Sequence, residues 1–294
     1  VNLTQISAGH WHTCALDSNN KAYCWGRGGN GQLGNNSTSN ASTSVAVHQG
    51  AIPSGVTLTH ITAGGFHTCA LGSDSKAYCW GENNKGQLGN NSTTDSRVPV
   101  AVFQGAIPSG INLTQILAGS SHTCALGSNN KAYCWGYNNS GQLGNNSTSD
   151  SRVPVAVSQG SIPSGVNLIQ ILAGYSHTCA LGSNGKAYCW GMNNKGQLGN
   201  NSTIDSRVPV AVAPGAIPTS VNLTQISASY DHACAFGSNN QVYCWGRGDH
   251  GQLGNNWTID RHSPTPVLMK TDPTITFGTG HLATNINLNV PENS

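Results

Sequence analysis

Short extended segments separated by small polar residues recur along the chain. Residues 3–8 alternate between apolar and polar side chains, which predicts a strand. Residues 12–16 and 21–25 are rich in strand formers and flank a short polar turn, which predicts a hairpin. A fourth segment, residues 97–102 of the next unit, contains Pro99, which cannot donate to a sheet ladder and therefore indicates an outer edge strand.

These four segments form one unit that the chain repeats five times. The unit reads His12-Thr-Cys-Ala-Leu16, then Ala22-Tyr-Cys-Trp-Gly26, then Gly31-Gln-Leu-Gly34, and its first cysteine recurs every 55 residues up to Cys234. A fixed period of this size is typical of propellers and other repeat architectures. Four short strands per unit, with an edge strand at the rim, predict an all-β protein, a β-propeller with four-stranded blades.

Three stretches of each unit combine into one specific motif. It reads Ala-Gly-x-x-His-x-x-Ala-Leu, Tyr-x-Trp-Gly and Asn-x-x-Gly-Gln-Leu-Gly, at residues 118–126, 133–136 and 138–144 of the third unit. Over residues 1 to about 268 this pattern resembles the repeats of the regulator of chromosome condensation (RCC) family. The resemblance implies a propeller, which in that family typically has seven blades. Family functions include nucleotide exchange on a small GTPase, chromatin binding and β-lactamase inhibition.

The chain departs from the family in three ways. It has five copies of the repeat, it carries added cysteine pairs, and it lacks the charged surfaces of the nuclear members. We therefore do not expect the nuclear exchange function, while the propeller fold is still expected.

Three side chains of each unit are expected to have structural roles. Packing between blades is expected for Leu33 and its equivalents and for Trp25, Trp80, Trp135, Trp190 and Trp245; ligand stacking by all five tryptophans is the alternative. The equivalent histidines are His12, His67, His122, His177 and His232. Symmetry-related side chains in a propeller lie too far apart for metal ligation at about 2 Å. The resemblance implies instead that each histidine braces a loop, and we expect its polar atoms to be satisfied by backbone groups.

Ten cysteines form five pairs, with nine residues between the partners of each pair. The pairs are Cys14 and Cys24, Cys69 and Cys79, Cys124 and Cys134, Cys179 and Cys189, and Cys234 and Cys244. In the predicted hairpin the two sulfurs lie nearly opposite each other, which favours disulfides and an oxidising, extracellular location. Zinc would need short Cys-x-x-Cys spacings, and helical twin-Cys hairpins lack the Gly-, Thr- and Tyr-rich context. Free buried pairs are the alternative in a reducing compartment.

A sequon for N-linked glycosylation recurs at the same loop position in every unit. The glycosylation candidates are Asn36, Asn91, Asn146, Asn201 and Asn256, and a further sequon begins at Asn138. An Asn-rich chain also makes sequons by chance, and Asn-Asn-Ser-Thr favours turns. Recurrence at one loop position favours glycans when a cell with the machinery secretes the protein.

Composition argues against several classes of function. Only 8% of the residues are charged, and 13 Lys and Arg against 11 Asp and Glu give a formal net charge of +2, so the basic footprint of a nucleic-acid-binding protein is absent. No apolar stretch approaches the roughly 20 residues that span a bilayer. Nucleophile elbows, phosphate loops and zinc-protease motifs do not occur, and no unit differs enough to hold distinct catalytic groups. We expect neither an enzyme nor a cofactor.

Two places in each unit do vary: the pair of residues before the histidine and the residue after Trp-Gly. Both are expected on loops at one face of the propeller. Aromatic and arginine side chains are typical anchors of protein contacts. The partner-binding candidates are Trp11, Phe66, Tyr137, Tyr175, Tyr230, Arg27 and Arg247.

The end of the chain differs from the repeats. We divide the chain into residues 1–270, which hold the five repeats, and residues 271–294, which resemble the start of a degenerate sixth repeat. Residues 283–290 alternate strictly between apolar and polar side chains, which predicts a strand. Such a strand either closes the ring against the first blade or adds to an edge of a neighbouring molecule.

Two functions fit this sequence. Near-identical units, low charge, sequons and a spare terminal strand favour a non-catalytic, extracellular, glycosylated building block of a surface or fibrillar assembly. The alternative is a secreted protein-binding propeller, an inhibitor or adhesin-like protein, that uses the variable loops of one face. In either case the expected partner is a protein or a second copy of the chain, with no nucleic acid and no membrane span. The sequence favours the building block.

Overall fold

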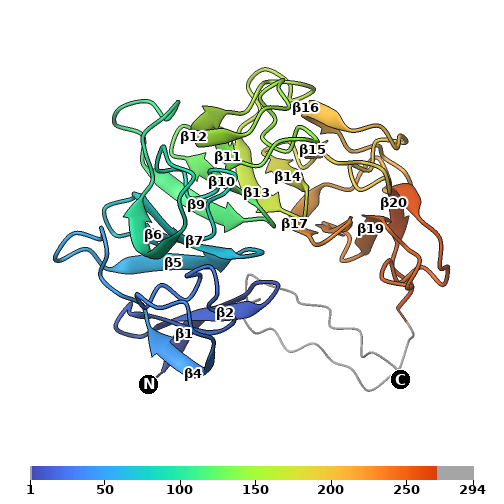
Figure 1. Ribbon diagram of the computed structural model, residues 1–294. Coiled ribbons are helices and arrows are strands. Elements are labelled where there is room, and N and C mark those ends of the chain that lie inside the picture. Colours follow the sequence, from blue (N-terminus) through green and yellow to red (C-terminus); the bar gives the residue numbers. More distant parts are fainter. Residues whose placement is uncertain (1, 270–294) are drawn as a thin grey trace.

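The protein folds into five four-stranded antiparallel sheets (Figure 1). A computed structural model describes residues 2–269, and in that range it contains strands and loops but no helix. Each sheet is built from one repeat, and its strands follow one another in chain order. The all-β class and the four-stranded blades that the sequence predicts are confirmed.

The blades are numbered in chain order. Blade 1 consists of β1 (Leu3–Ala8), β2 (His12–Asp17), β3 (Ala22–Gly26) and β4 (Ala41–Ala46). Blade 2 consists of β5 (Leu58–Ala63), β6 (His67–Gly72), β7 (Ala77–Gly81) and β8 (Ser96–Ala101). Blade 3 consists of β9 (Leu113–Ala118), β10 (His122–Gly127), β11 (Ala132–Gly136) and β12 (Ser151–Ala156). Blade 4 consists of β13 (Leu168–Ala173), β14 (His177–Gly182), β15 (Ala187–Gly191) and β16 (Ser206–Ala211). Blade 5 consists of β17 (Leu223–Ala228), β18 (His232–Gly237), β19 (Val242–Gly246) and β20 (Arg261–Pro266).

The second and third strands of each blade form the predicted hairpin. In blade 3, Cys124 lies opposite Cys134 and Thr123 lies opposite Trp135. Asn130 in the turn has a φ of 58°, a left-handed conformation that asparagine tolerates better than most residues. The fourth strand pairs only with the third, so it is an edge strand, as Pro154 in β12 indicates.

All five predicted disulfides are present. They join Cys14 to Cys24, Cys69 to Cys79, Cys124 to Cys134, Cys179 to Cys189 and Cys234 to Cys244. Each joins two residues that face each other across one hairpin, so the bridges fix the register in which β2 and β3, and their equivalents, pair. No cysteine in residues 2–269 is free.

The apolar core lies between neighbouring blades. At the junction of blades 1 and 2, Leu33 and the Cys14 and Cys24 side chains pack against Leu58 and Trp80. Equivalent clusters lie at the next three junctions. Burying one tryptophan of about 200 Å² contributes about 5 kcal/mol. The predicted packing role is confirmed for the tryptophans of blades 2 to 5, which are Trp80, Trp135, Trp190 and Trp245, all fully buried.

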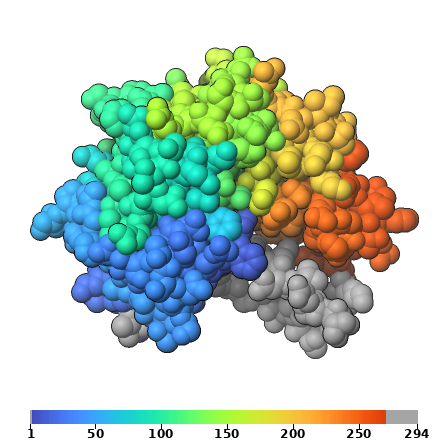
Figure 2. All heavy atoms as spheres, in the orientation of Figure 1, coloured from blue at the N-terminus to red at the C-terminus, as the bar shows by residue number. Residues whose placement is uncertain are grey.

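The five blades form an open arc. Strand β1 packs against β5, β5 against β9, β9 against β13 and β13 against β17, but no comparable packing joins β17 to β1 in the described range. Figure 1 shows blade 1 in blue and blade 5 in orange-red on either side of the opening, and Figure 2 shows the blades as one continuous band of atoms. Leu3 on the open side of blade 1 is 53% exposed, whereas its equivalent Leu58 is 5% exposed.

Trp25 does not have the packing role that the sequence predicts for it. It is only partly buried and lines the open face of blade 1. The reason is that its partner surface, a preceding blade, is absent from the described residues. The predictions for residues 271–294, a degenerate repeat and a closing or donated strand, lie outside those residues. The division of the chain near residue 270 stays a prediction.

Candidate functional site

A buried set of hydrogen bonds joins neighbouring blades. Between blades 1 and 2, the Trp80 indole N–H and the Thr68 hydroxyl both donate to the backbone carbonyl of Gln32, at 3.0 and 2.8 Å. Because the hydroxyl proton is used there, Thr68 Oγ1 accepts from the Nε2–H of His12, which lies 2.8 Å away. We call these four residues, and the equivalent sets at the other junctions, the blade lock.

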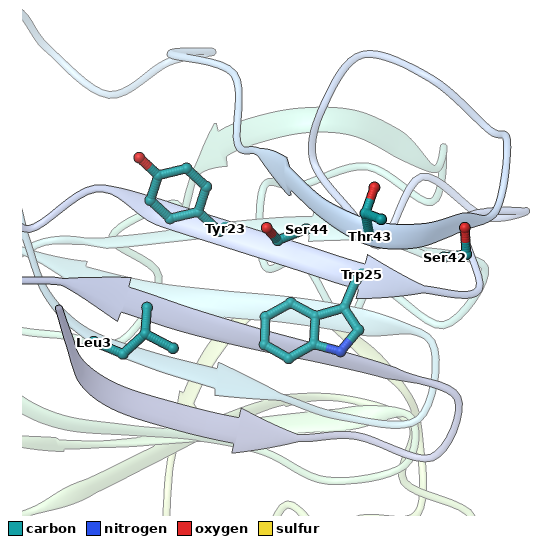
Figure 3. Close-up of a pocket in the computed structure, with 6 residues that line it drawn as sticks. All are labelled: Leu3, Tyr23, Trp25, Ser42, Thr43 and Ser44. Atoms are coloured by element: carbon teal, nitrogen blue, oxygen red, sulfur yellow. The ribbon is translucent and has the colours of Figure 1, made fainter. Parts of the chain in front are cut away.

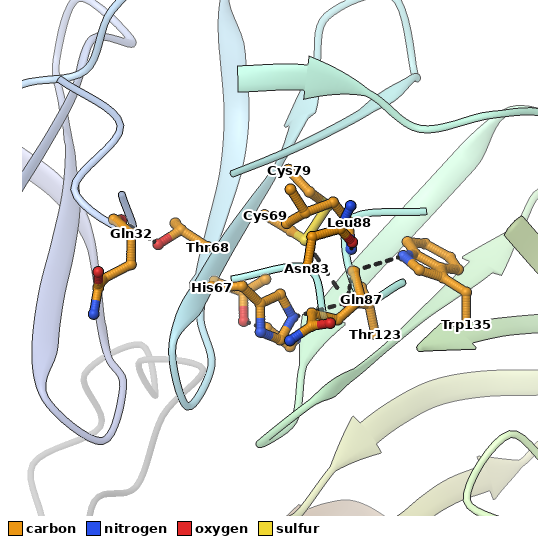
Figure 4. The surroundings of a disulfide bond; sticks show 12 residues. Gln32, His67, Thr68, Cys69, Cys79, Asn83, Gln87, Leu88, Thr123 and Trp135 are labelled. Carbon is orange, nitrogen blue, oxygen red and sulfur yellow. Dashed lines mark hydrogen bonds between the residues drawn. A yellow bond between two sulfur atoms is a disulfide. The ribbon is translucent and has the colours of Figure 1, made fainter. Parts of the chain in front are cut away.

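The blade lock recurs along the arc. Its second copy consists of His67, Gln87, Thr123 and Trp135 (Figure 4). Its third copy consists of His122, Gln142, Thr178 and Trp190. The lock side chains are buried, and an unpaired polar group in such a place costs about 1–3 kcal/mol. The predicted structural role of the histidines in blades 1 to 3 is confirmed. The predicted way in which they act, bracing a loop through backbone groups, is wrong, because each bonds to a threonine side chain of the next blade.

The fourth lock lacks its threonine. Blade 5 has Ala233 at this position, and Trp245 still donates to the Gln197 carbonyl at 3.0 Å. Without the hydroxyl, His177 has no hydrogen-bond partner on either ring nitrogen within the described part of the chain. The sequence does carry a signal. The residue that follows the equivalent histidine is threonine in blades 1 to 4 and alanine, Ala233, in blade 5. The sequence alone does not pair that threonine with the histidine of the preceding blade, because the two residues lie about 56 positions apart.

The lock histidines are held neutral. The Nδ1 atoms of His12, His67, His122 and His177 are buried and have no partner in residues 2–269. Burial lowers the pKa of His67 and His177 to about 3, and that of His12 and His122 to about 4, from an ordinary 6.5. A proton on Nδ1 would give the buried ring a positive charge, and within residues 2–269 no acceptor contacts Nδ1.

Sequence reasoning missed an asparagine that shapes the lock loop. Asn83 is fully buried, and its amide donates to the Ser92 and Thr94 carbonyls at 3.0 Å, while its Oδ1 accepts from the Leu88 N–H at 2.9 Å. These bonds hold the loop that presents the Gln87 carbonyl. Asn138 and Asn193 make the equivalent bonds in blades 3 and 4.

The two end blades lack this asparagine. Gly28 and Gly248 occupy its position in blades 1 and 5. A Cβ atom at Gly28 would lie 2.0 Å from the Ser39 carbonyl oxygen, so the loop has closed onto the space that the asparagine fills elsewhere. One consequence is that Asn35 Oδ1, whose equivalent on Asn90 accepts from Asn83, is buried without a partner within the described range. Asn255 Nδ2 of blade 5 is also buried without a partner there.

The variable positions lie together on one face. The backbone N–H of the residue after Trp-Gly donates to the backbone carbonyl of the residue before the lock histidine. The distance is 2.8 Å from Arg27 to Trp11 and 2.9 Å from Glu82 to Phe66. Equivalent bonds occur in blades 3 to 5. We call this surface the variable face. It comprises residues 10–11, 65–66, 120–121, 175–176 and 230–231, together with residues 27, 82, 137, 192 and 247.

The outer part of the variable face carries cation and ring pairs. Trp11 is 60% exposed. The Arg27 guanidinium carbon lies 5.0 Å from the centroid of the Phe66 ring, and the Lys85 ammonium lies 5.2 Å from that of Tyr137. In blade 5, Arg247 pairs with Asp249 at 2.8 Å, and this hydrogen bond lowers the pKa of the Asp249 carboxyl to about 2.

Three rings from different blades meet at the centre of the variable face. His10 of blade 1 stacks on Tyr175 of blade 4, with ring centroids 5.7 Å apart and planes 3° apart. Tyr175 also lies 4.2 Å, centroid to centroid, from Tyr230 of blade 5. Blades 2 and 3 have only Gly65 and Ser120 at the equivalent positions. The centre is therefore aromatic on the side of blades 1, 4 and 5 only.

The glycosylation candidates lie beside the junctions between blades. The Asn36 backbone N–H donates to the Arg97 carbonyl of the next blade at 2.9 Å, and its side chain is exposed. Asn91, Asn146 and Asn201 make the same bond, and Asn256 is likewise exposed. By contrast, Asn138, the first residue of its sequon, is fully buried, and its side-chain amide is used in the lock loop. The first asparagine of each Asn-Asn pair is also at least partly buried, so the second is the accessible acceptor.

Residues 2–269 contain no helix that is long and apolar enough to cross a membrane. Within the same residues, no group of three or more His, Cys, Asp or Glu side chains is arranged to hold a metal ion.

Successive blades joined by the blade lock define a β-propeller of RCC-type repeats. The family model described as the RCC1-like domain matches residues 1–285, and the chain belongs to this family. The ultraviolet-B receptor UVR8 of Arabidopsis thaliana is 32% identical over 264 residues, which are 90% of this chain and 57% of UVR8. The chain thus spans little more than half of that relative's length.

Solved structures show the same fold. Human WBSCR16 superposes with a TM-score of 0.78 at 22% identity, over 91% of this chain and 67% of that protein. Yeast RCC1 (Prp20), solved with Kap60 bound, superposes with a TM-score of 0.57 at 20% identity, over 92% of this chain and 76% of that one. These matches confirm the predicted RCC-type resemblance and the blade architecture.

Completing the fourth lock should stabilise the protein. In Ala233→Thr, the new hydroxyl can accept from His177 and donate to the Gln197 carbonyl, so we expect the free energy of unfolding to rise by about 1 kcal/mol in urea titrations. Thr123→Ala removes the equivalent hydroxyl from the second lock and should lower the free energy of unfolding by about 1–3 kcal/mol. Thr13→Ala is the matched control, because no described blade precedes blade 1. An unchanged stability in both Ala233→Thr and Thr123→Ala would contradict the lock.

Mild acid should unfold the protein through the lock histidines. Their folded pKa values lie below 6.5, so the unfolded state binds more protons between about pH 4 and 6.5, and stability is lost as pH falls through that range. Each contributes a loss of about 2 kcal/mol between pH 6.5 and 5. When urea titrations are repeated at several pH values, His122→Gln should reduce the slope of the free energy of unfolding against pH by one proton. Equal stability at pH 5 and 7 would rule this linkage out.

Proposed function

We propose that this protein is a non-catalytic, protein-binding propeller that holds its partner on the variable face. The observation that carries the proposal is where the differences between units fall. The lock residues are nearly identical in every blade, whereas the positions that vary are joined by backbone hydrogen bonds on one surface. A binding module is expected to keep the residues of its scaffold the same in every repeat and to differ between repeats at its contact surface.

The chemistry of the variable face supports a protein partner. Tryptophan, tyrosine and arginine dominate binding energies at protein interfaces because they combine large apolar area with polar groups. Trp11, Tyr175, Tyr230 and the Arg27–Phe66 pair provide these groups. Yeast RCC1, which has the same fold, is solved in a complex with the protein Kap60, and this is consistent with the proposal.

We further propose an extracellular location. Five disulfides support it, because such bonds persist in oxidising compartments and are rare in the cytosol. The exposed sequons beside the junctions between blades support glycosylation in a secreting cell.

The building block of an extracellular assembly is the second candidate function. The observation that favours it is the pair of unlike open faces on blades 1 and 5, since unlike faces that do not close a ring generate open assemblies when copies associate. In this proposal the terminal strand predicted at residues 283–290 adds to an edge of the next copy.

Substitutions on the variable face should abolish partner binding without loss of stability. Protein immobilised and exposed to the culture medium of its source should retain one protein in stoichiometric amount, identified by mass spectrometry. We expect Trp11→Ala and Tyr230→Ala to reduce retention at least tenfold, because both side chains are exposed anchors. Phe103→Ser, an exposed residue just after the outer strand β8, is the matched control.

Two outcomes would speak against the binding module. Equal retention by wild type, Trp11→Ala and Tyr230→Ala would show that the variable face is not the contact surface. Filaments in electron microscopy and light scattering, with no retained protein, would favour the building block.

Burial should decide which sequons carry glycans. In protein secreted from a eukaryotic cell, peptide mapping should find glycans at one or more of Asn36, Asn91, Asn146, Asn201 and Asn256, and none at Asn138. A glycan on Asn138 would break the bonds that shape the lock loop, so folded protein should not carry one. Folded, secreted protein with Asn138 glycosylated would contradict the description of this loop. Secreted protein with all five exposed sites empty would refute the glycosylation proposal.

A further inference from the structure

Two tyrosine rings at the centre of the variable face are in close contact. The ring centroids of Tyr175 and Tyr230 lie 4.2 Å apart, and the ring planes are tilted by 35°. Ordinary aromatic pairs have centroids roughly 4.5–7 Å apart. The two residues belong to blades 4 and 5, and no other pair of tyrosine rings is in contact in residues 2–269.

The backbone keeps these two residues beside each other. The Tyr175 N–H donates to the Tyr230 carbonyl at 3.2 Å, so both side chains start from neighbouring segments of backbone. On the side of blade 1, the His10 ring stacks on Tyr175, with centroids 5.7 Å apart and planes 3° apart. These contacts hold Tyr175 in place and keep Tyr230 next to it.

The hydroxyl ends of the two tyrosines also lie together. Burial raises the pKa of the Tyr230 hydroxyl, and a side-chain hydrogen bond with Tyr175 raises it further. The hydroxyl is the one hydrogen-bonding group of a tyrosine side chain. Because the rings are in contact and their hydroxyl ends meet, the ring carbons next to the two hydroxyls are neighbours as well. These carbons are the positions at which oxidised phenols couple to each other.

An oxidant in solution has access to this pair. Tyr230 is 50% exposed. Four of the other tyrosines are almost fully buried, namely Tyr78, Tyr133, Tyr188 and Tyr243. Oxidation from solution is therefore directed to a residue that already has a second phenol beside it.

The tyrosine pair joins the two blades whose lock is incomplete. Tyr175 and Tyr230 occupy equivalent positions in successive repeats. The equivalent pairs at the first three junctions are His10 and Gly65, Gly65 and Ser120, and Ser120 and Tyr175. Two tyrosines therefore meet only at the fourth junction, where Ala233 replaces the lock threonine and His177 has no partner in residues 2–269. A covalent bond between the two rings would strengthen the junction that has the fewest lock bonds.

We propose that Tyr175 and Tyr230 form a dityrosine cross-link within one chain when the protein meets hydrogen peroxide and a haem peroxidase. Each phenol loses one electron and one proton, and the two phenoxyl radicals join by a carbon–carbon bond between the ring positions next to the oxygens. The hydrogens on these two carbons then move to the oxygens, which restores both phenols. The peroxide takes up the two electrons and two protons and leaves as two molecules of water. No partner of the variable face takes part, so this proposal and the binding proposal succeed or fail separately.

The test exposes the purified full chain, dilute enough that chains rarely meet, to a haem peroxidase and hydrogen peroxide. We expect dityrosine fluorescence from monomeric chains, a mass loss of two hydrogen atoms, and a linked pair of peptides that contain Tyr175 and Tyr230. Tyr175→Phe and Tyr230→Phe keep both rings but remove one phenol, so each should reduce this product at least tenfold. Tyr23→Phe is the matched control and should leave the yield unchanged, because Tyr23 lies on blade 1 beside Leu3 and Trp25 and contacts no tyrosine ring (Figure 3).

A second measurement tests the effect on the junction. In the cross-linked protein, the amide hydrogens of β18 and β19 should exchange with solvent severalfold more slowly than in the unreacted protein, because the bond keeps blade 5 beside blade 4. Equal exchange in the two forms would contradict the strengthening of this junction. Cross-links that join two chains, or that use other tyrosines, would overturn the proposal. So would the absence of any cross-link within the chain when the same peroxide and peroxidase couple N-acetyltyrosine.

Discussion

At each of the first three junctions, one buried backbone carbonyl accepts two of the hydrogen bonds that join neighbouring blades. The Gln87 carbonyl takes the Thr123 hydroxyl proton and the Trp135 indole proton, and Thr123 in turn accepts from His67. Thr123 and Trp135 can both reach the carbonyl because they face each other across the β10–β11 hairpin. The disulfide one residue further along fixes that pairing. The threonine matters most in this set, because its loss leaves the buried histidine without a partner, as at His177, where Ala233 replaces the threonine.

The same constraint explains where the blades differ. Positions that take no part in the lock, on the variable face, are free to change, and they carry the exposed aromatic and charged side chains. The departures inside the lock fall in blade 5, at Ala233, and in the lock loops of the two end blades, at Gly28 and Gly248. Each of these departures coincides with unsatisfied polar atoms, on His177, Asn35 and Asn255. The binding proposal therefore concerns a surface whose residues lie outside the lock.

Much of the fold could be predicted from the sequence because its signals are local. Alternation defined the strands, the nine-residue gap placed Cys124 opposite Cys134 across a hairpin, and Pro154 indicated the outer edge. The role of Thr123 could not be predicted, because its bonds reach the preceding blade and depend on how blades are placed against each other. Asn138 shows the same limit: its sequon reads as a surface site, but its side chain is buried in the lock loop. Trp25 has the same sequence context as Trp135, and only the arrangement of blades exposes it.

The most direct test of this account is the protonation of the lock histidines, measured by ¹⁵N NMR of the imidazole nitrogens in the intact protein between pH 5.5 and 8. The account predicts that His67 and His122 stay neutral throughout, with the proton on Nε2, because Nε2–H donates to the threonine of the next blade and burial holds each pKa at about 3 to 4. Histidines that titrate near 6.5, or that carry the proton on Nδ1 at neutral pH, would show that the blade lock does not join the blades in this way.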